Sequence, residues 1–191
     1  MNVRKCVIAL ALGTALIYKS IRAAIQAHEG TELFCLPSLF LGEETPRSMF
    51  VSADVFGAVD GPWPDTRDGR RQAMLRSLFD GFTEGDRFTL ANNPFVKPSK
   101  TMIARVAPVE AEVFDFRCLD PRPGIRAFGR FAEQDVFVAL SWDYRENLVG
   151  MDDWCVEVQN CLNLWQKLFG CLEPHKGHTV SDYISYNACA V

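Results

Sequence analysis

The chain has 191 residues, of which 48% are hydrophobic, so it is long and apolar enough to bury the core of one domain. That composition excludes an intrinsically disordered protein, which has too few apolar residues to form a core. The formal net charge of −4 at pH 7 excludes indiscriminate binding of nucleic acids, because such binding depends on neutralising phosphates with Lys and Arg. A local basic patch is compatible with this total.

The N-terminal segment does not decide between a cytoplasmic and an exported protein. A basic start precedes the apolar run Cys6–Tyr18, which is short for a membrane span and has the length of a signal-peptide core. Lys19 and Arg22 follow the run closely, and no clean cleavage motif follows within residues 1–27, so we expect a cytoplasmic protein with export as the alternative. A membrane-associated amphipathic helix is a further reading, although no membrane partner is indicated.

A strand-like pattern begins at Met49, whereas residues 30–48 have no clear periodicity. We therefore expect residues 1–48 to form an N-terminal extension, which is either signal-like or precedes the true start. Residues 49–191 are then expected to form a single α+β domain.

A helix is predicted over Thr66–Phe82, with apolar residues at helical spacing and Asp65 or Thr66 as its N-cap. Two short strands are expected after it, at Arg87–Leu90 and Thr101–Val106, separated by a turn-rich segment. A solvated helix face is the simplest explanation of the helix's arginines, which are Arg67, Arg70, Arg71 and Arg76.

Residues 112–147 alternate with the period of three consecutive β-strands. Pro121, Pro123 and Gly124 separate the first two strands, and a short loop ending at Gln134 separates the second and third. Consecutive strands joined by short loops pair antiparallel, so we expect a β-meander.

The second strand has an apolar face that begins at Ile125 and a face that carries Arg126, Phe128 and Arg130. The apolar face is suited to a core and the other to a charged, solvent-facing surface. On this basis, replacing Arg126 and Arg130 by alanine is expected to leave the protein folded.

A second helix is predicted over Asp152–Phe169, with a stop at Gly170. Its apolar stripe, expected to lie in the core, consists of Trp154, Cys161, Trp165 and Leu168. The expected fold class is therefore α+β: an antiparallel β-meander sheet packed by two helices.

The seven cysteines are odd in number and lack a paired C-x-x-C, which favours reduced thiols over a disulfide framework. Cys171, His175 and His178 are close in sequence, and Cys161 would complete four metal ligands. The loose spacing favours structural cysteines, and we expect no metal and no other cofactor.

The segment from Phe114 to Asn147 resembles the sheet region of RelE/ParE-like toxins, including their phage and HigB-like relatives. That family has an xxIR strand end, a strand with a yR pair, a hydrophobic strand and then a polar or aromatic segment. The corresponding residues are Phe116 and Arg117, Ile125 and Arg126, Val136 to Leu140, and Tyr144 and Arg145. The layout is also similar to that of uncharacterised bacterial proteins, a similarity that implies no function.

The toxin resemblance implies a metal-free mRNA endonuclease, ribosome-dependent or free, or a topoisomerase poison, either one neutralised by a cognate antitoxin. RNA cleavage by the 2′-hydroxyl requires phosphate charge to be stabilised and the leaving oxygen to be protonated. Arg117, Arg126 and Arg130 are the candidates for binding phosphate through their guanidinium groups. Tyr144 and Arg145 are the candidates for proton transfer or base stacking. For each arginine, a surface salt bridge is the simpler explanation.

Two other classes stay open. A non-enzymatic protein-binding module, with a phage origin as one alternative, would use an exposed aromatic patch rimmed by arginine and formed by Phe128, Trp142 and Tyr144. A hydrolase would need a catalytic pair, for which the sequence offers Asp143 with Glu146 or Cys171 with His175. The expected partners are thus an antitoxin, another protein or RNA.

Overall fold

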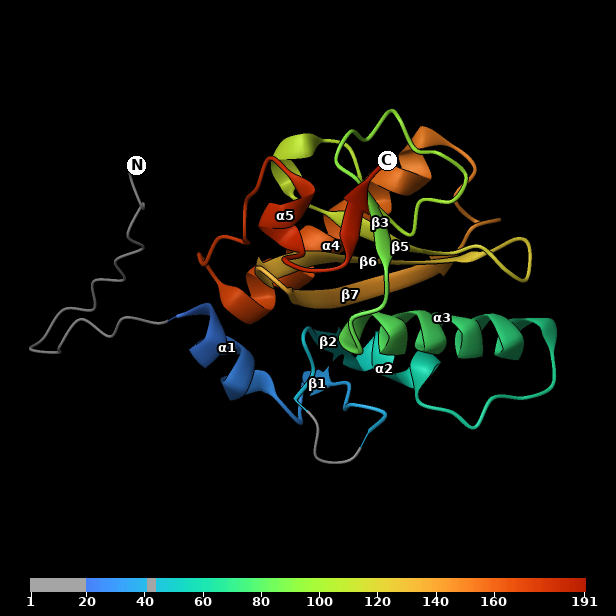
Figure 1. The fold of residues 1–191 in the computed structure, drawn as a ribbon. Helices are drawn as coiled ribbons and strands as arrows, with labels where there is room; N and C mark the ends of the chain where they lie inside the picture. Colours follow the sequence, from blue (N-terminus) through green and yellow to red (C-terminus); the bar gives the residue numbers. More distant parts are fainter. Residues whose placement is uncertain (1–19, 41–43) are drawn as a thin grey trace, which may run out of the picture.

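The computed structural model describes residues 20–40 and 44–191. One eight-stranded sheet runs through it in the order β1-β2-β7-β6-β5-β4-β3-β8, with helices on both faces (Figure 1). The strands are β1 Leu33–Cys35, β2 Ser48–Ser52, β3 Phe88–Ala91, β4 Ile103–Arg105, β5 Phe114–Cys118, β6 Ile125–Glu133, β7 Val136–Tyr144 and β8 Ala188–Ala190. The helices are α1 Ile21–His28, α2 Ala53–Val59, α3 Arg67–Thr83, the 3₁₀-helix η1 Val109–Ala111, α4 Met151–Phe169 and α5 Val180–Tyr183.

The predicted meander is present, because β5, β6 and β7 pair antiparallel in sequence order. The α+β class is also confirmed, but the sheet is mixed rather than antiparallel throughout. Strand β2 pairs parallel with β7, and β3 pairs parallel with both β4 and β8. Parallel neighbours need crossover connections rather than hairpins. Helices α2 and α3 lie on the path from β2 toward β7, and α4 and α5 lie on the path from β3 toward β8. The described residues also contain five α-helices rather than the two expected.

The two predicted helices are confirmed with small shifts at their ends. The α3 helix begins where expected, with the Thr66 hydroxyl accepting a hydrogen bond from the Gly69 N–H. The α4 helix begins one residue early, and the Asp153 carboxylate accepts the N–H of Gly150 at 2.8 Å. It ends at Gly170, whose φ of 61° suits glycine. Ser52 ends the strand that begins near Met49 because its hydroxyl caps α2.

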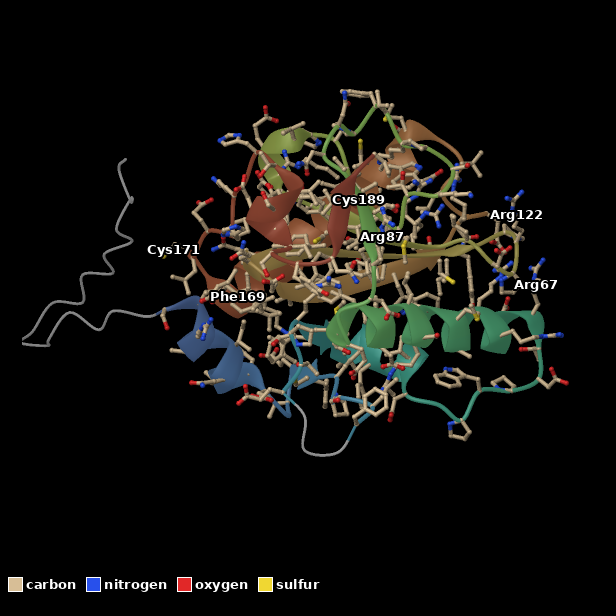
Figure 2. The ribbon with its side chains drawn as sticks, in the orientation of Figure 1. Arg67, Arg87, Arg122, Phe169, Cys171 and Cys189 are labelled. Carbon is tan, nitrogen blue, oxygen red and sulfur yellow. The ribbon has the colours of Figure 1, made fainter. Side chains whose placement is uncertain are left out.

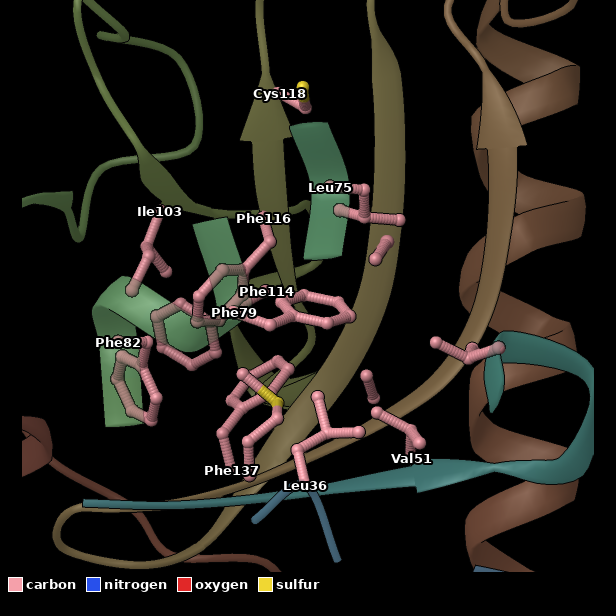
Figure 3. Packing of buried hydrophobic residues seen from close by; sticks show 14 of the residues in the cluster. Leu36, Val51, Leu75, Phe79, Phe82, Ile103, Phe114, Phe116, Cys118 and Phe137 are labelled. Carbon is pink, nitrogen blue, oxygen red and sulfur yellow. The ribbon is translucent and has the colours of Figure 1, made fainter. Parts of the chain in front are cut away.

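Each face of the sheet has its own core. On one face α2 and α3 cover an aromatic cluster in which Phe79 and Phe82 meet Phe116 and Phe137 of the sheet (Figure 3). On the other face α1 and α4 cover Phe128, Leu140 and their neighbours. No helix within the described ranges is both long and apolar enough to cross a bilayer. The apolar run Cys6–Tyr18 lies outside the described ranges.

The burial of both faces corrects the expectation of a charged, solvent-facing surface on β6. Arg126 and Arg130 are only 5% and 7% exposed, and Phe128 between them is fully buried. Alternation along a strand identifies two faces but cannot show that a distant helix covers the more polar one.

The described part of the N-terminal extension belongs to the same sheet. Strand β1 pairs antiparallel with β2, with Leu33 opposite Ser52, and Leu33 is fully buried. Ala24 of α1 is buried in the core beneath α4. Met49 itself lies inside β2, so the structure shows no gap in packing at this position.

Candidate anion-binding surface

Three of the five predicted site residues meet at one end of the sheet, where β5 ends and β6 begins. Arg117 of β5 is the cross-strand partner of Arg126 of β6, so both side chains lie on the face covered by α4. Arg145 follows β7, and its backbone N–H donates to the Gly124 carbonyl at 2.8 Å. Arg122, in the loop between β5 and β6, marks this end of the molecule in Figure 2.

The β3–β4 loop adds a fourth cation. The Lys97 ammonium lies 5.6 Å from the centre of the Trp154 ring, and the Arg145 guanidinium lies 5.6 Å from the same ring centre. Arg117 donates to the Pro98 carbonyl at 3.4 Å, which ties the loop to β5. Cations over an indole ring are attracted by its electron-rich face. Lys97, Arg117, Arg126 and Arg145 are called the cationic cluster below.

Asp115 is the buried counter-ion of this cluster. It is 1% exposed, and its Oδ2 lies 3.2 Å from Nε of Arg126 and 3.9 Å from Nε of Arg117. Neither oxygen accepts an aligned hydrogen bond from the described residues, so the contacts are electrostatic. Burial raises the pKa of Asp115, while Lys97, Arg126 and Arg117 act in the opposite direction.

The positive charges of the cluster exceed the charge of this counter-ion. Burial is the main cause that lowers the pKa of Lys97, and the positive charges of Arg117 and Arg126 lower it further. Burial likewise lowers the pKa of Arg126, and Arg117 and Arg145 add to this effect. Asp115 is the carboxylate that raises the pKa of both Lys97 and Arg126. Four cations lie around the buried Asp115, and Asp143 of β7 is opposite Arg126, so positive charge remains in excess and attracts an anion.

Arg130 and Tyr144 lie away from the cluster. Arg130 sits further along β6, where its Nη2 donates to the Ala111 carbonyl at 2.6 Å and its guanidinium lies 5.0 Å from the centre of the Trp165 ring. The Tyr144 ring faces α3 on the opposite side of the sheet, with the Arg71 guanidinium 4.7 Å from its centre. The sheet therefore separates Tyr144 from the arginines with which the sequence grouped it.

The predicted aromatic patch is not formed. Phe128 is fully buried with its ring 5.7 Å from that of Trp154, and Trp142 and Tyr144 are half-buried against the core under α3. This prediction failed for the same reason as the charged surface, because both faces of the meander are covered.

Exposed apolar side chains instead lie in the two loops that meet at Trp154. Phe95 and Val96 precede Lys97 and are 80% and 55% exposed. Val149 and Met151 flank the start of α4 and are 83% and 73% exposed. Local patterns do not single out these residues, because the segment before Lys97 has the composition of a turn. The signal that the sequence does contain is two apolar residues next to a lysine.

The metal and hydrolase alternatives gain no support. No group of three His, Cys, Asp or Glu residues within the described ranges could hold a metal ion. The His175 ring instead contacts the Asp182 carbonyl at 2.7 Å through Nε2. Glu146 accepts from Arg71 at 2.8 Å, so it is already paired. The free thiols in the described residues are Cys35, Cys118, Cys155, Cys161 and Cys189. Cys171 is disulfide-bonded, which corrects the expectation of reduced thiols at that position.

No protein-family model, curated protein or solved structure matches this chain. Function is therefore inferred from the geometry of the surface around Trp154.

Proposed function

We propose that this protein is a non-enzymatic binding module that docks an acidic segment of another protein on the cationic cluster. The observation that carries the proposal is the excess of positive charge around Asp115, next to exposed apolar side chains. Complementary charge steers such a partner and fixes its orientation, and apolar side chains at the same surface supply contact area.

The apolar residues favour a protein partner over a nucleic acid. Phe95 precedes Lys97 in the β3–β4 loop, and Met151 begins α4, three residues before the Trp154 ring that Lys97 contacts, so an incoming chain would meet both apolar and positive groups. An acidic segment with aromatic or aliphatic side chains satisfies both requirements. The overall charge of −4 opposes polyanions that contact a large area of the protein, whereas a short segment contacts only the local patch.

The test is a titration of the full chain with three labelled probes, followed by fluorescence anisotropy. The first is a peptide in which glutamate alternates with phenylalanine, the second has glutamine in place of each glutamate, and the third is a single-stranded RNA of similar length. We expect saturable binding of the glutamate peptide and affinity lower by at least about tenfold for the glutamine peptide.

The double variant Lys97→Ala/Arg145→Ala removes two of the more accessible cations of the cluster, and we expect it to lose most of the binding. Lys176→Ala is the matched control, because Lys176 is exposed and paired with Glu173 at 3.1 Å, outside the cluster. Equal binding of the glutamate and glutamine peptides, or full binding by the double variant, would refute the proposal.

A metal-free RNA endonuclease is the second candidate, favoured by the convergence of Arg117, Arg126 and Arg145. In this reading their guanidinium groups hold the phosphate while the RNA 2′-hydroxyl attacks it. A 2′,3′-cyclic phosphate forms, the bond to the 5′-oxygen breaks, and water takes the 2′-hydroxyl proton and supplies a proton to the leaving 5′-oxygen. It predicts growth arrest and RNA cleavage when the full chain is expressed, and loss of both in Arg117→Ala. The full chain is used because β1 and α1 are packed into the fold. Tight RNA binding with cleavage would favour this candidate over the binding module.

A further inference from the structure

A cavity of about 540 Å³, open to solvent on one side, lies beside the middle of α4, away from the residues of the cationic cluster. Its walls come from α4, from the β2–α2 junction and from the turn before β1. Its apolar lining residues are Leu140, Leu164 and Leu168, and its polar lining residues include Ser141, Asn160 and Asn163. Ligand pockets commonly measure about 300–1,000 Å³ and combine an apolar lining with a few convergent polar groups.

The sheet topology places the cavity where ligands often bind. Strand β2 is parallel to β7, with Val51 opposite Ala139, and the cavity opens beside the residues that follow this pair. In sheets with parallel strands and helical connections, small molecules bind in crevices at the carboxyl ends of the strands. Ser52, at the carboxyl end of β2, lines the cavity, and so does Leu140, which lies in the middle of β7, so the rule applies to the β2 end of this pair.

The charged groups around the cavity favour a cation. Lys167 lines the cavity, but its ammonium lies 2.6 Å from Oε1 of Glu32, so this positive charge is already paired. Asp54 also lines the cavity. The Glu157 carboxylate accepts hydrogen bonds from two lining side chains, Ser141 at 3.1 Å and Asn160 at 3.2 Å.

The Glu157 carboxylate supports the same conclusion. Burial raises its pKa, and the negative charges of Asp143 and Asp54 raise it further. A cation bound at the cavity would favour the ionised form of Glu157.

We infer that this cavity binds a small aliphatic amine, with the ammonium group against the Asp54 carboxylate at the cavity wall and the alkyl stem against Leu140, Leu164 and Leu168. Glu157 lies behind the lining residues Ser141 and Asn160 and adds negative charge on that side. Asn160 lies at the same wall, where its amide nitrogen donates to Glu157 and its amide oxygen is the hydrogen-bond acceptor for the ammonium. This site is separate from the surface of the proposed function, and each can fail without the other.

The test is isothermal titration of the full chain with n-pentylamine, with 1-pentanol as the neutral probe of the same length. We expect saturable binding of the amine and affinity weaker by at least about tenfold for the alcohol. Asp54→Asn keeps the shape of a side chain that lines the cavity and removes its charge, and we expect it to weaken amine binding by a similar factor. Leu164→Trp fills the cavity and is expected to abolish binding.

Glu173→Gln is the control, because Glu173 is an exposed glutamate paired with Lys176 and does not line the cavity. Circular dichroism confirms that each variant is folded, and Glu157→Gln replaces Asp54→Asn if the latter is not. Absence of saturable amine binding by the wild-type protein, or equal binding of amine and alcohol, overturns the inference. Unchanged amine affinity in the charge-removing variant overturns it as well.

Discussion

Arg126 illustrates, at the scale of single residues, how burial reverses an interpretation made from alternation alone. The pattern placed Arg126 and Arg130 on a solvent-facing surface, where substitution is harmless. In the structure, Arg126 lies 3.2 Å from the fully enclosed carboxylate of Asp115. Removal of one partner of a buried ion pair leaves the other charge unpaired in a medium that solvates it poorly.

Arg126→Ala is therefore expected to lower the free energy of unfolding by about 3–5 kcal/mol, the usual cost of breaking a buried pair. Urea denaturation at neutral pH measures the change. Arg67→Ala is the control, because Arg67 is a largely exposed arginine at the start of α3 and such ion pairs contribute about 1 kcal/mol or less. A stability of Arg126→Ala equal to that of the control would show that Asp115 is not buried as described.

Glu157 gives a prediction of pH dependence. Because burial raises the pKa of Glu157 in the folded protein, the unfolded chain loses this proton first as the pH rises. Wild-type protein therefore loses stability between the ordinary glutamate pKa and the raised value, whereas Glu157→Gln does not. We expect the stability of Glu157→Gln relative to wild type to increase with pH across this window. Urea denaturation at a series of pH values measures it, and a difference independent of pH would contradict the prediction.

At the scale of secondary-structure elements, helix α4 covers one face of the sheet and buries both apolar and charged side chains there. Trp165 is 2% exposed, donates from Nε1 to the Leu172 carbonyl at 2.8 Å and lies under the guanidinium of Arg130. Trp165→Ala is expected to destabilise the protein by about 3–5 kcal/mol, because it leaves a large cavity in the core between α4 and the sheet. Thermal and urea unfolding measure this loss, and a native-like melting temperature would argue against the packing of α4.

The elements that sequence patterns predicted well are those with strong local signals. Thr66 caps α3, Gly170 ends α4, and the alternation in β5 to β7 survives in the structure. The β1 and β8 strands have three residues each, too few to show a period, and their positions depend on partners distant in sequence. The parallel pairing of β3 with β4 could not be read from the short segment between them, because pairing direction is decided by the whole sheet.

For the whole molecule, the sequence identified part of the candidate site but grouped it wrongly. Arg117, Arg126 and Arg145 do come together, because strands of a meander bring the ends of neighbours to one edge. Tyr144 and Arg145 are adjacent in sequence, so their side chains point to opposite faces of the sheet. Local patterns could not predict that Lys97 belongs to the cluster, because its contact with Trp154 joins two segments that are far apart in sequence.

The most direct test of the central claim is the titration of the Lys97 ammonium by NMR, in the free protein and with the glutamate–phenylalanine peptide bound. The Lys97 resonance is assigned by its loss in Lys97→Arg. We predict a pKa below the ordinary lysine value in the free protein, because burial, Arg117 and Arg126 all lower it. We also predict a rise on peptide binding, since a nearby negative charge favours the protonated amine. An ordinary pKa in the free protein, or a pKa unchanged by bound peptide, would contradict a positively charged surface that an acidic partner neutralises.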